Sequence, residues 1–195
     1  MTVEPMGDRA YIARQLSAPA WFIADTWRRA RLAGVREVVA AYESVAVIVD
    51  PEVFEIESLV EPPTEGWPVR PVTEVPVRYD GADLEEVATR LGWTVGQVIE
   101  SHTRQVYTCY AIGFCPGFPY LGYVEGELAT LGRRPEPRVR VPAGSVAIAG
   151  KQTGIYPLER PGGWWLLGTA DYRVVDLAEG FFAFAPGDRV KFCAI

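Results

Sequence analysis

Residues 138–168 read RVRVPAGSVAIAGKQTGIYPLERPGGWWLLG, a series of short apolar runs separated by Gly and Pro. β-Branched and aromatic residues favour strands, whereas Gly and Pro favour tight turns. The pattern predicts strands at Val139–Val141, Ser145–Ala149 and Trp164–Gly168. Short strands at this spacing are typical of an antiparallel barrel or sandwich.

The sequence on both sides of this stretch extends the same pattern. Two short helices are predicted before it, each opening with a capping box, Asp83 with Glu86 and Thr94 with Gln97. His102 falls at the end of the second helix. Further strands are predicted at Val75–Tyr79, Val106–Phe114, Arg173–Asp176, Phe181–Phe184 and Arg189–Cys193.

The chain before residue 70 has a different texture. Residues 61–76 read EPPTEGWPVRPVTEVP, and five prolines make this segment an expected extended linker. Upstream of it, strand and helix signals alternate as β-α-β-β-α-β, the ferredoxin-like pattern. The expected strands are Asp8–Arg14, Val35–Ala41, Val45–Val49 and Val72–Val75, with one helix between Ser17 and Gly34 and another opening at Pro51.

Composition excludes several classes of protein. The net charge of −6 argues against general nucleic-acid binding, and the longest apolar runs, of five residues, predict no membrane span. Three cysteines without a visible secretory signal predict a cytoplasmic protein with free thiols. One histidine and scattered cysteines predict that this chain binds no metal by itself.

Several residues are candidates for chemistry. Alternation places Arg138 and Arg140 on one face of a strand, where guanidinium groups could bind an anion or protect a sheet edge by charge. His102 is a candidate proton carrier or a cation at a helix C-terminus. Residues 144–153, GSVAIAGKQT, lack the spacing of a phosphate-binding P-loop. Residues 113–123, GFCPGFPYLGY, could line an apolar pocket or form a partner surface.

Four blocks of sequence resemble one known family. These are YDGADLEEVATRLGWTVGQVIESHT (79–103), GFCPGFPYLGYV (113–124), RRPEPRVRVPAGSVAIAGKQTGIYP (133–157) and PGGWWLLG (161–168). In this order they resemble the KipI / allophanate hydrolase subunit 1 family, which includes the B subunits of ATP-dependent 5-oxoprolinase.

The resemblance implies a fold and a function. It implies an α+β ferredoxin-like domain over residues 1–70 and a mainly β cyclophilin-like barrel over residues 71–195. It implies an enzyme subunit, inactive alone, of an ATP-dependent amidohydrolase that opens 5-oxoproline to glutamate. The implied partners are a KipA / allophanate hydrolase subunit 2-type protein and a third subunit. ATP, with Mg²⁺, is expected at the level of the complex.

The resemblance also implies site residues and leaves alternatives open. The catalytic candidates are His102, Arg138 and Arg140. The family usually has Arg-Thr after the strand that ends at Gly168, whereas Thr169 and Ala170 stand here. Other members are inhibitors of a sensor histidine kinase or act in the allophanate and urea pathway, so both functions remain alternatives. The candidates for substrate or nucleotide binding are Ser145, Lys151, Gln152, Thr153 and Tyr156.

Overall fold

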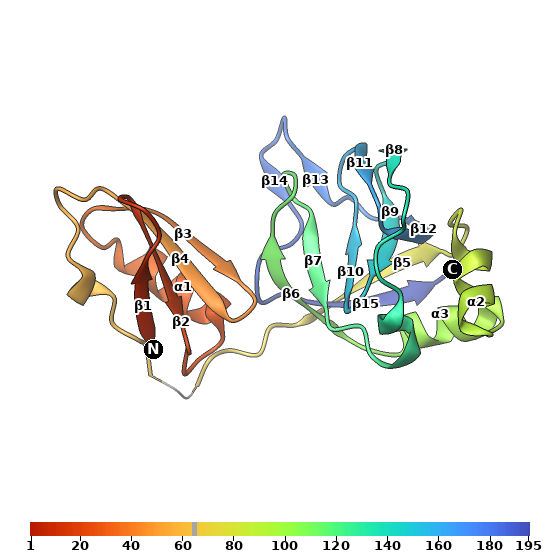
Figure 1. Ribbon diagram of the computed structural model, residues 1–195, viewed down its shortest axis with the longest axis horizontal. Coiled ribbons are helices and arrows are strands. Elements are labelled where there is room, and N and C mark those ends of the chain that lie inside the picture. Colours follow the sequence, from red (N-terminus) through yellow and green to blue (C-terminus); the bar gives the residue numbers. More distant parts are fainter. Residues whose placement is uncertain (64–65) are drawn as a thin grey trace. The chain divides into compact units, whose positions relative to one another are not determined.

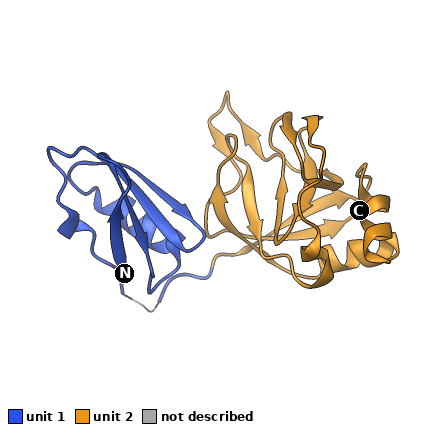
Figure 2. Cartoon of the chain, in the orientation of Figure 1, with its two compact units in different colours: residues 1–69 blue, residues 70–195 orange. Residues whose placement is uncertain are grey.

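A computed structural model describes residues 1–63 and 66–195 of the chain. The described residues form two compact units, residues 1–69 and residues 70–195 (Figure 2). The predicted linker over 61–76 includes residues 64 and 65, which lie outside the described residues. No helix in the described ranges combines the length and the apolar character that crossing a bilayer requires.

Unit 1 is a four-stranded antiparallel sheet with one α-helix on it (Figure 1). The sheet order is β1-β2-β4-β3. Ile23, Ala24 and Trp27 recur at helical spacing on α1 and are buried against the sheet, since burial of apolar area is the main stabilising contribution here. The elements are β1 (Thr2–Pro5), β2 (Ala10–Arg14), α1 (Ala20–Ala30), β3 (Val35–Ala41), β4 (Ser44–Val49) and a 3-10 turn, η1 (Ile56–Ser58).

The ferredoxin-like α+β fold predicted for this half is wrong. The helix expected from Pro51 is only the 3-10 turn Ile56–Ser58, which buries no residue and so gains little from packing. The last strand expected near Val72–Val75 belongs to β5, which pairs with strands of unit 2. The described residues are therefore mostly β, with three short α-helices between them.

Unit 2 contains a closed barrel of seven strands, in the order β10-β7-β6-β15-β5-β12-β9. Most neighbours are antiparallel, but β5 and β15 are parallel. The barrel strands are β5 (Val72–Arg78), β6 (Tyr107–Ile112), β7 (Pro119–Gly122), β9 (Ser145–Ala149), β10 (Gln152–Ile155), β12 (Trp165–Ala170) and β15 (Arg189–Ala194).

The remaining elements of unit 2 lie around the barrel. Helices α2 (Leu84–Leu91) and α3 (Val95–Thr103) pack against β12 and β15. Two ribbons stand apart from the barrel at its upper end in Figure 1. One pairs β8 (Arg138–Val141) with β11 (Arg160–Gly162), and the other pairs β13 (Val175–Asp176) with β14 (Phe181–Phe182). A 3-10 turn, η2, spans Gly126–Thr130.

Strand β9 separates two apolar clusters because successive side chains of a strand point to opposite faces. Val146 and Ile148 belong to the main barrel core. Ala147 and Ala149 belong to a smaller cluster that also holds Cys115, Phe118, Val141, Tyr156, Trp164 and Leu166. This aromatic cluster is the outer layer on which the site described below is built.

Candidate functional site

His102 lies in the interior of unit 2 as part of a chain of hydrogen bonds. It is fully buried on α3, and its ring stacks on Phe192 at a centroid distance of 4.6 Å. Nδ1 lies 2.6 Å from the Tyr79 hydroxyl, and Nε2 lies 2.9 Å from Thr153 Oγ1. Thr153 Oγ1 in turn donates to the Ala147 carbonyl, 3.0 Å away.

This network assigns the tautomer of His102. The single Thr153 hydroxyl proton is donated in a hydrogen bond to the Ala147 carbonyl. Thr153 Oγ1 therefore accepts a hydrogen bond from Nε2–H of His102. Nδ1 then accepts a hydrogen bond from the Tyr79 hydroxyl, whose pKa is raised by burial. Burial lowers the pKa of His102 to about 3, so the ring is neutral. His102 and Thr153 are thus buried and hydrogen-bonded within unit 2, an arrangement that does not offer the ring for proton transfer to a substrate.

Arg138 binds a buried carboxylate within the chain. Its two Nη atoms lie 2.8 and 2.6 Å from the two oxygens of Asp83, a two-pronged ion pair. Arg134 reaches the same carboxylate at 2.5 Å, and the backbone N–H of Leu166 donates to it at 2.8 Å. Arg140 instead pairs with Glu159 at 3.0 Å on the surface. The structure thus gives Arg138 and Arg140 separate partners and does not bring them to one anion.

The β9–β10 hairpin separates the other predicted residues. Ser145 and Tyr156 meet at one end, where the Tyr156 N–H donates to the Ser145 carbonyl. Lys151 and Gln152 lie at the turn end, and the Lys151 carbonyl accepts from Val124 N–H at 2.9 Å. Four residues of strand span about 13 Å, so the two ends cannot contact one small ligand together.

An aromatic pocket opens beside Tyr156, at the end of the hairpin that also holds Ser145. Its volume is about 60 Å³. Phe118 forms the floor, with ring contacts to Tyr156, Tyr120 and Trp164 at 5.0–5.3 Å. Of residues 113–123, for which an apolar pocket or a partner surface is predicted, Phe114, Phe118 and Tyr120 line this pocket. The pocket is lined by Phe114, Phe118, Tyr120, Arg133, Tyr156, Gly162, Gly163 and Trp164.

Two glycines allow the pocket wall to come close to Tyr156. A Cβ on Gly162 would lie 2.2 Å from the Tyr156 hydroxyl oxygen, so any larger residue would displace that ring. Gly163 continues the wall, and its carbonyl accepts from the Arg134 N–H at 2.7 Å. The Tyr156 hydroxyl therefore lies against backbone at the pocket rather than inside the barrel.

The pocket presents hydrogen-bond donors that the chain itself does not use. Among residues 1–63 and 66–195, neither the Tyr156 nor the Tyr120 hydroxyl has a hydrogen-bond partner, and exposed Arg133 has no ion pair. Burial raises the pKa of Tyr156 to about 12, and Arg133 lowers it by a smaller amount. Burial raises the pKa of Tyr120 as well, so both phenols are protonated at neutral pH and can donate to a ligand oxygen. Such a set suits a small ligand with an apolar body and oxygen acceptors.

Cysteine chemistry has little support at this pocket. Cys115 is buried in the aromatic cluster, and burial raises the pKa of its thiol despite the nearby Arg160 guanidinium. Burial also raises the pKa of Cys109, to about 12. A thiolate is the reactive form, so neither side chain is poised as a nucleophile. In the described part of the chain, no group of three or more His, Cys, Asp or Glu side chains could hold a metal ion.

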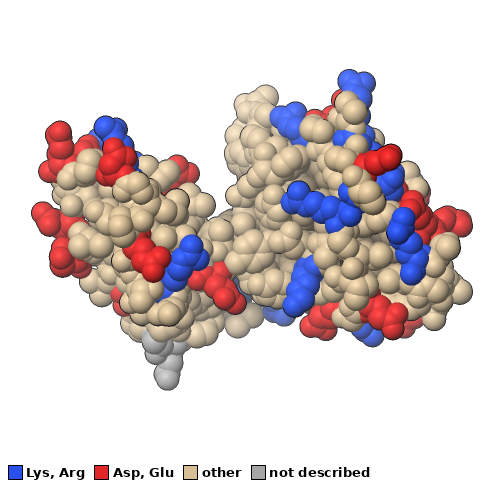
Figure 3. Space-filling view, in the orientation of Figure 1, with Lys and Arg blue, Asp and Glu red and all other residues tan. Residues whose placement is uncertain are grey.

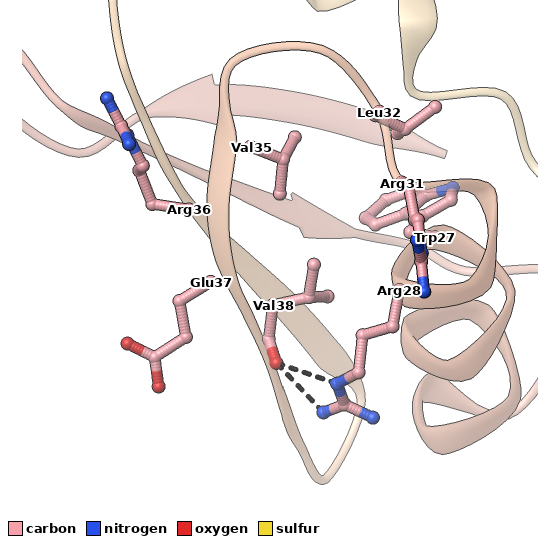
Figure 4. A pocket seen from close by; sticks show the side chains of 8 residues that line it. All are labelled: Trp27, Arg28, Arg31, Leu32, Val35, Arg36, Glu37 and Val38. Carbon is pink, nitrogen blue, oxygen red and sulfur yellow. Dashed lines mark hydrogen bonds between the residues drawn. The ribbon is translucent and has the colours of Figure 1, made fainter.

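A larger groove of about 570 Å³ lies in unit 1, between α1 and the edge strand β3 (Figure 4). Arg28 crosses it, donating from Nε and Nη2 to the Val38 carbonyl and from Nη1 to Asp25. Arg36 points away from α1 and pairs with Asp50. Because Arg28 covers an outward carbonyl of an edge strand, we interpret this groove as edge protection rather than a ligand site.

The sequence alone does not predict contacts between residues that are far apart in the chain. The spacing predicts that Asp83 caps α2, but its side chain makes no capping bond and binds Arg134 and Arg138 instead. In the sequence Arg133 is one member of an arginine-rich segment, although it alone of the four arginines lines the pocket. The aromatic spacing of residues 113–123 is the one local signal of this site.

Comparisons with known proteins bear on the family. The carboxyltransferase domain model, subdomain C and D, matches residues 1–180. The B subunit of 5-oxoprolinase from Escherichia coli O157:H7 is 39% identical over 182 residues, covering 85% of this chain and 83% of that protein. The B subunit of 5-oxoprolinase from Bacillus subtilis strain 168 is 43% identical over 130 residues, covering 65% of this chain and 54% of that protein.

A solved structure supports the same relationship. The crystal structure of TTHA0988 superposes with a TM-score of 0.88 at 42% sequence identity and covers 96% of this chain. This chain spans 40% of the length of that protein, so the similarity concerns one part of it. The chain belongs to the carboxyltransferase domain family, subdomains C and D, and within it to the KipI / allophanate hydrolase subunit 1 group that contains the 5-oxoprolinase B subunits.

Proposed function

We propose that this chain is a subunit of a 5-oxoprolinase-type complex, which uses ATP to open the lactam of 5-oxoproline to glutamate. Its partner in this proposal is a KipA / allophanate hydrolase subunit 2-type protein, with a third subunit. The observation that carries the proposal is the 39% identity to a 5-oxoprolinase B subunit across 182 residues. We expect the complex to be cytoplasmic and this chain to be inactive alone.

The aromatic pocket supports the choice of substrate. 5-Oxoproline has a small ring of apolar carbons, a carboxylate and a lactam carbonyl. The Phe118 and Trp164 rings offer an apolar wall, and Arg133 offers a cation for the carboxylate. The Tyr156 hydroxyl, kept protonated by burial, offers a donor for a carbonyl oxygen. In this proposal the chain binds and orients the lactam.

The small size of the pocket supports a shared site. Pockets that enclose a small molecule usually have volumes of roughly 300–1,000 Å³. The volume here is about 60 Å³. In this proposal, this chain therefore supplies one wall of the site and a partner subunit supplies the rest. A site shared between two subunits is consistent with the described residues of this chain, which do not form a complete set of catalytic groups.

ATP is assigned to the complex rather than to this chain. ATP would supply a phosphoryl group that activates the poorly electrophilic lactam. Two observations support this assignment: residues 144–153 fold as the β9–β10 hairpin, and Arg138 is occupied by Asp83. We therefore place ATP and Mg²⁺ at the level of the complex and derive no step through them here.

The proposal is tested by reconstitution. The chain is mixed with its subunit 2-type partner and the third subunit, and phosphate release is measured with and without 5-oxoproline. We expect release that depends on 5-oxoproline for the complete mixture and none for this chain alone. Absence of that activity in a complex that forms would contradict the proposed function.

A variant then tests the pocket. Arg133→Leu removes the carboxylate partner, so we expect the KM for 5-oxoproline to rise at least 10-fold, since an ion pair with a ligand is lost. Arg9→Leu is the control, because Arg9 is an exposed arginine of unit 1. An unchanged KM in Arg133→Leu would remove the pocket from the substrate site while leaving the family assignment intact.

A further inference from the structure

The backbone of Arg133 is anchored on both sides, although its side chain is exposed at the aromatic pocket. The carbonyl of Gly132, which precedes it, accepts a hydrogen bond from the indole N–H of buried Trp165 at 2.7 Å. The N–H of Arg134, which follows it, donates to the Gly163 carbonyl at 2.7 Å. The two peptide groups that flank the Arg133 Cα are therefore held by β12 and by the pocket wall.

The side chain of Arg134 does not line the pocket and forms a buried ion pair instead. Its Nη1 atom lies 2.5 Å from Asp83 Oδ1, and the two side chains are 20% and 2% exposed. The guanidinium group also lies over the Trp165 ring, 4.9 Å from the ring centroid. Guanidinium groups suit such pairs because their planar donors fix the direction of approach. Trp165 thus contacts Arg134 and also holds the carbonyl of Gly132.

The residue after Arg134 limits the freedom of this backbone. Pro135 follows Arg134 directly, and a residue that precedes proline is confined to extended conformations. The Asp83 ion pair and the Gly163 hydrogen bond therefore act on a stiff stretch of chain. Because Arg133 is the neighbouring residue, its Cα cannot move far while both of these contacts are present.

Asp83 is fixed to the barrel independently of Arg134. Its backbone N–H donates to the Leu166 carbonyl at 3.1 Å, and the Leu166 N–H donates to its Oδ2 at 2.8 Å. Arg138 binds both of its oxygens and lies opposite Gly162 in the β8–β11 ribbon. One carboxylate therefore holds the residue beside the pocket cation and the strand opposite the pocket wall.

A surface cation is not by itself unusual in unit 2. Figure 3 shows Lys and Arg side chains over much of the face of unit 2 that it draws. A cation that recognises a small ligand needs a defined place, since groups that are held before binding lose less freedom when the ligand arrives. Arg133 combines a place at a pocket with two anchored peptide groups and a neighbour in a buried ion pair.

We propose that the Asp83–Arg134 ion pair positions Arg133 for the carboxylate of the substrate. Neither Asp83 nor Arg134 lines the pocket, so both are positioning residues that act through Arg133. The carboxylate and the lactam carbonyl of 5-oxoproline occupy fixed places on one small ring. The Arg133 guanidinium group must therefore lie at a set distance from the Tyr156 hydroxyl to bind both. This inference rests on the proposed function, because it concerns the same substrate at the same pocket.

Arg134→Leu tests the proposal in the assembled complex. The variant removes the ion pair, whereas Asp83 keeps its other side-chain partners, so the fold is retained. Arg90→Leu is the matched control, because the Arg90 guanidinium group also lies 4.9 Å from the Trp165 centroid but pairs with Glu86 on its own helix. Melting temperatures verify the folding of both variants.

We expect Arg134→Leu to raise the KM for 5-oxoproline about 5-fold and to change kcat less than about twofold, because a displaced cation weakens binding of the substrate. Arg90→Leu should change the KM less than about twofold. In a chain that already carries Arg133→Leu, adding Arg134→Leu should have almost no further effect, since both residues act on one contact. An unchanged KM in Arg134→Leu, or an equal rise with and without Arg133→Leu, would overturn the positioning role.

Amide hydrogen exchange gives a readout that needs no substrate. The N–H at position 134 is protected by its bond to Gly163 in the isolated chain. We expect its protection factor to fall roughly 10-fold in Arg134→Leu and to stay within about twofold in Arg90→Leu. A wild-type complex inactive toward 5-oxoproline would overturn the proposed function. Exchange would then decide the anchoring of Arg133 alone: lost protection would support it, and unchanged protection would overturn it.

Discussion

Arg138 and Asp83 form a two-pronged ion pair that ties the β8–β11 ribbon to the barrel. Asp83 precedes α2, is 1% exposed, and also accepts from the Leu166 backbone on β12. Its carboxylate thus joins a helix start, a barrel strand and a ribbon. Because the ribbon carries Gly162 of the pocket wall, this ion pair fixes the position of the wall.

Loss of Arg138 should therefore reduce stability. Arg138→Ala leaves a buried carboxylate with only Arg134 as a cationic partner, and we expect the free energy of unfolding to fall by about 3 kcal/mol. Arg140→Ala is the control, since its exposed pair with Glu159 contributes about 0.5 kcal/mol or less. Urea denaturation measures both. Equal, small decreases in the free energy of unfolding for the two variants would show that Arg138 is not needed to stabilise the buried Asp83 carboxylate.

The buried neutral state of His102 predicts a pH dependence. Below pH 6.5 the unfolded chain binds a proton at His102. The folded chain does not bind this proton until the pH approaches 3, because the pKa of buried His102 is about 3. Stability contributed by the neutral ring is thus complete above pH 6.5 and is lost as the pH falls toward 3. Between pH 7 and pH 5 we expect a loss of about 2 kcal/mol from this group.

Two measurements check the His102 prediction. The chain has one histidine, so its imidazole signals in NMR spectra are unambiguous, and they should not titrate between pH 8 and pH 5. His102→Gln should show a shallower decline in unfolding free energy over the same range. An imidazole that titrates near pH 6.5 in the folded chain would contradict the buried network and restore His102 as a proton carrier.

Gly168 should tolerate no side chain. A Cβ there would lie 2.2 Å from the Arg78 carbonyl oxygen, where β12 approaches β5, and backbone cannot move aside cheaply. We expect Gly168→Ala to lower the free energy of unfolding by about 1–3 kcal/mol, as overpacking does. Gly132→Ala is the control, since no atom lies within 4 Å of its added Cβ. Thermal denaturation compares them, and a neutral Gly168→Ala would contradict the close approach.

The Tyr156 hydroxyl should serve binding and not folding. Tyr156→Phe removes an O–H that bonds to nothing in the described chain, so the free energy of unfolding should change by less than about 0.5 kcal/mol. In the assembled complex its loss should raise the Kd for 5-oxoproline by roughly 5–10-fold, the contribution of one hydrogen bond. Calorimetry with 5-oxoproline measures this, and an unchanged Kd would remove the hydroxyl from the substrate site.

Tyr107→Phe gives the opposite pattern and serves as the comparison. The Tyr107 hydroxyl is buried, donates to the His102 carbonyl at 2.8 Å and accepts from Gln105. Its removal leaves that carbonyl without a partner, so we expect a loss of about 1–2 kcal/mol in unfolding free energy. The pair of variants separates a hydroxyl that faces a ligand from one that holds the core.

Local sequence predicts features that depend on neighbouring residues. The capping box at Thr94 and Gln97 is confirmed, with the Gln97 N–H donating to Thr94 Oγ1 and the Thr94 N–H to Gln97 Oε1. The barrel strand at Ser145–Ala149 has the predicted bounds. Both features depend on residues a few positions apart, so a short window of sequence contains the information.

Features that depend on distant residues are not predictable in this way. Asp83 and Glu86 have the spacing of a capping box, yet Asp83 binds arginines 51 and 55 residues away. Residues 72–75 have the pattern of a strand, but pattern alone does not say which sheet the strand joins. The ferredoxin-like prediction is wrong for this reason, since β5 pairs with β15 rather than with the first half of the chain.

The parallel pairing of β5 with β15 has a consequence for synthesis of the protein. Val72–Arg78 lies beside Arg189–Ala194, so the barrel cannot close until the ribosome has released the second of these strands. During translation the interior-facing side chains of the other six strands remain open to chaperones and to aggregation. Barrel closure then requires two segments more than a hundred residues apart to meet. This step is slow because bringing them together costs chain entropy.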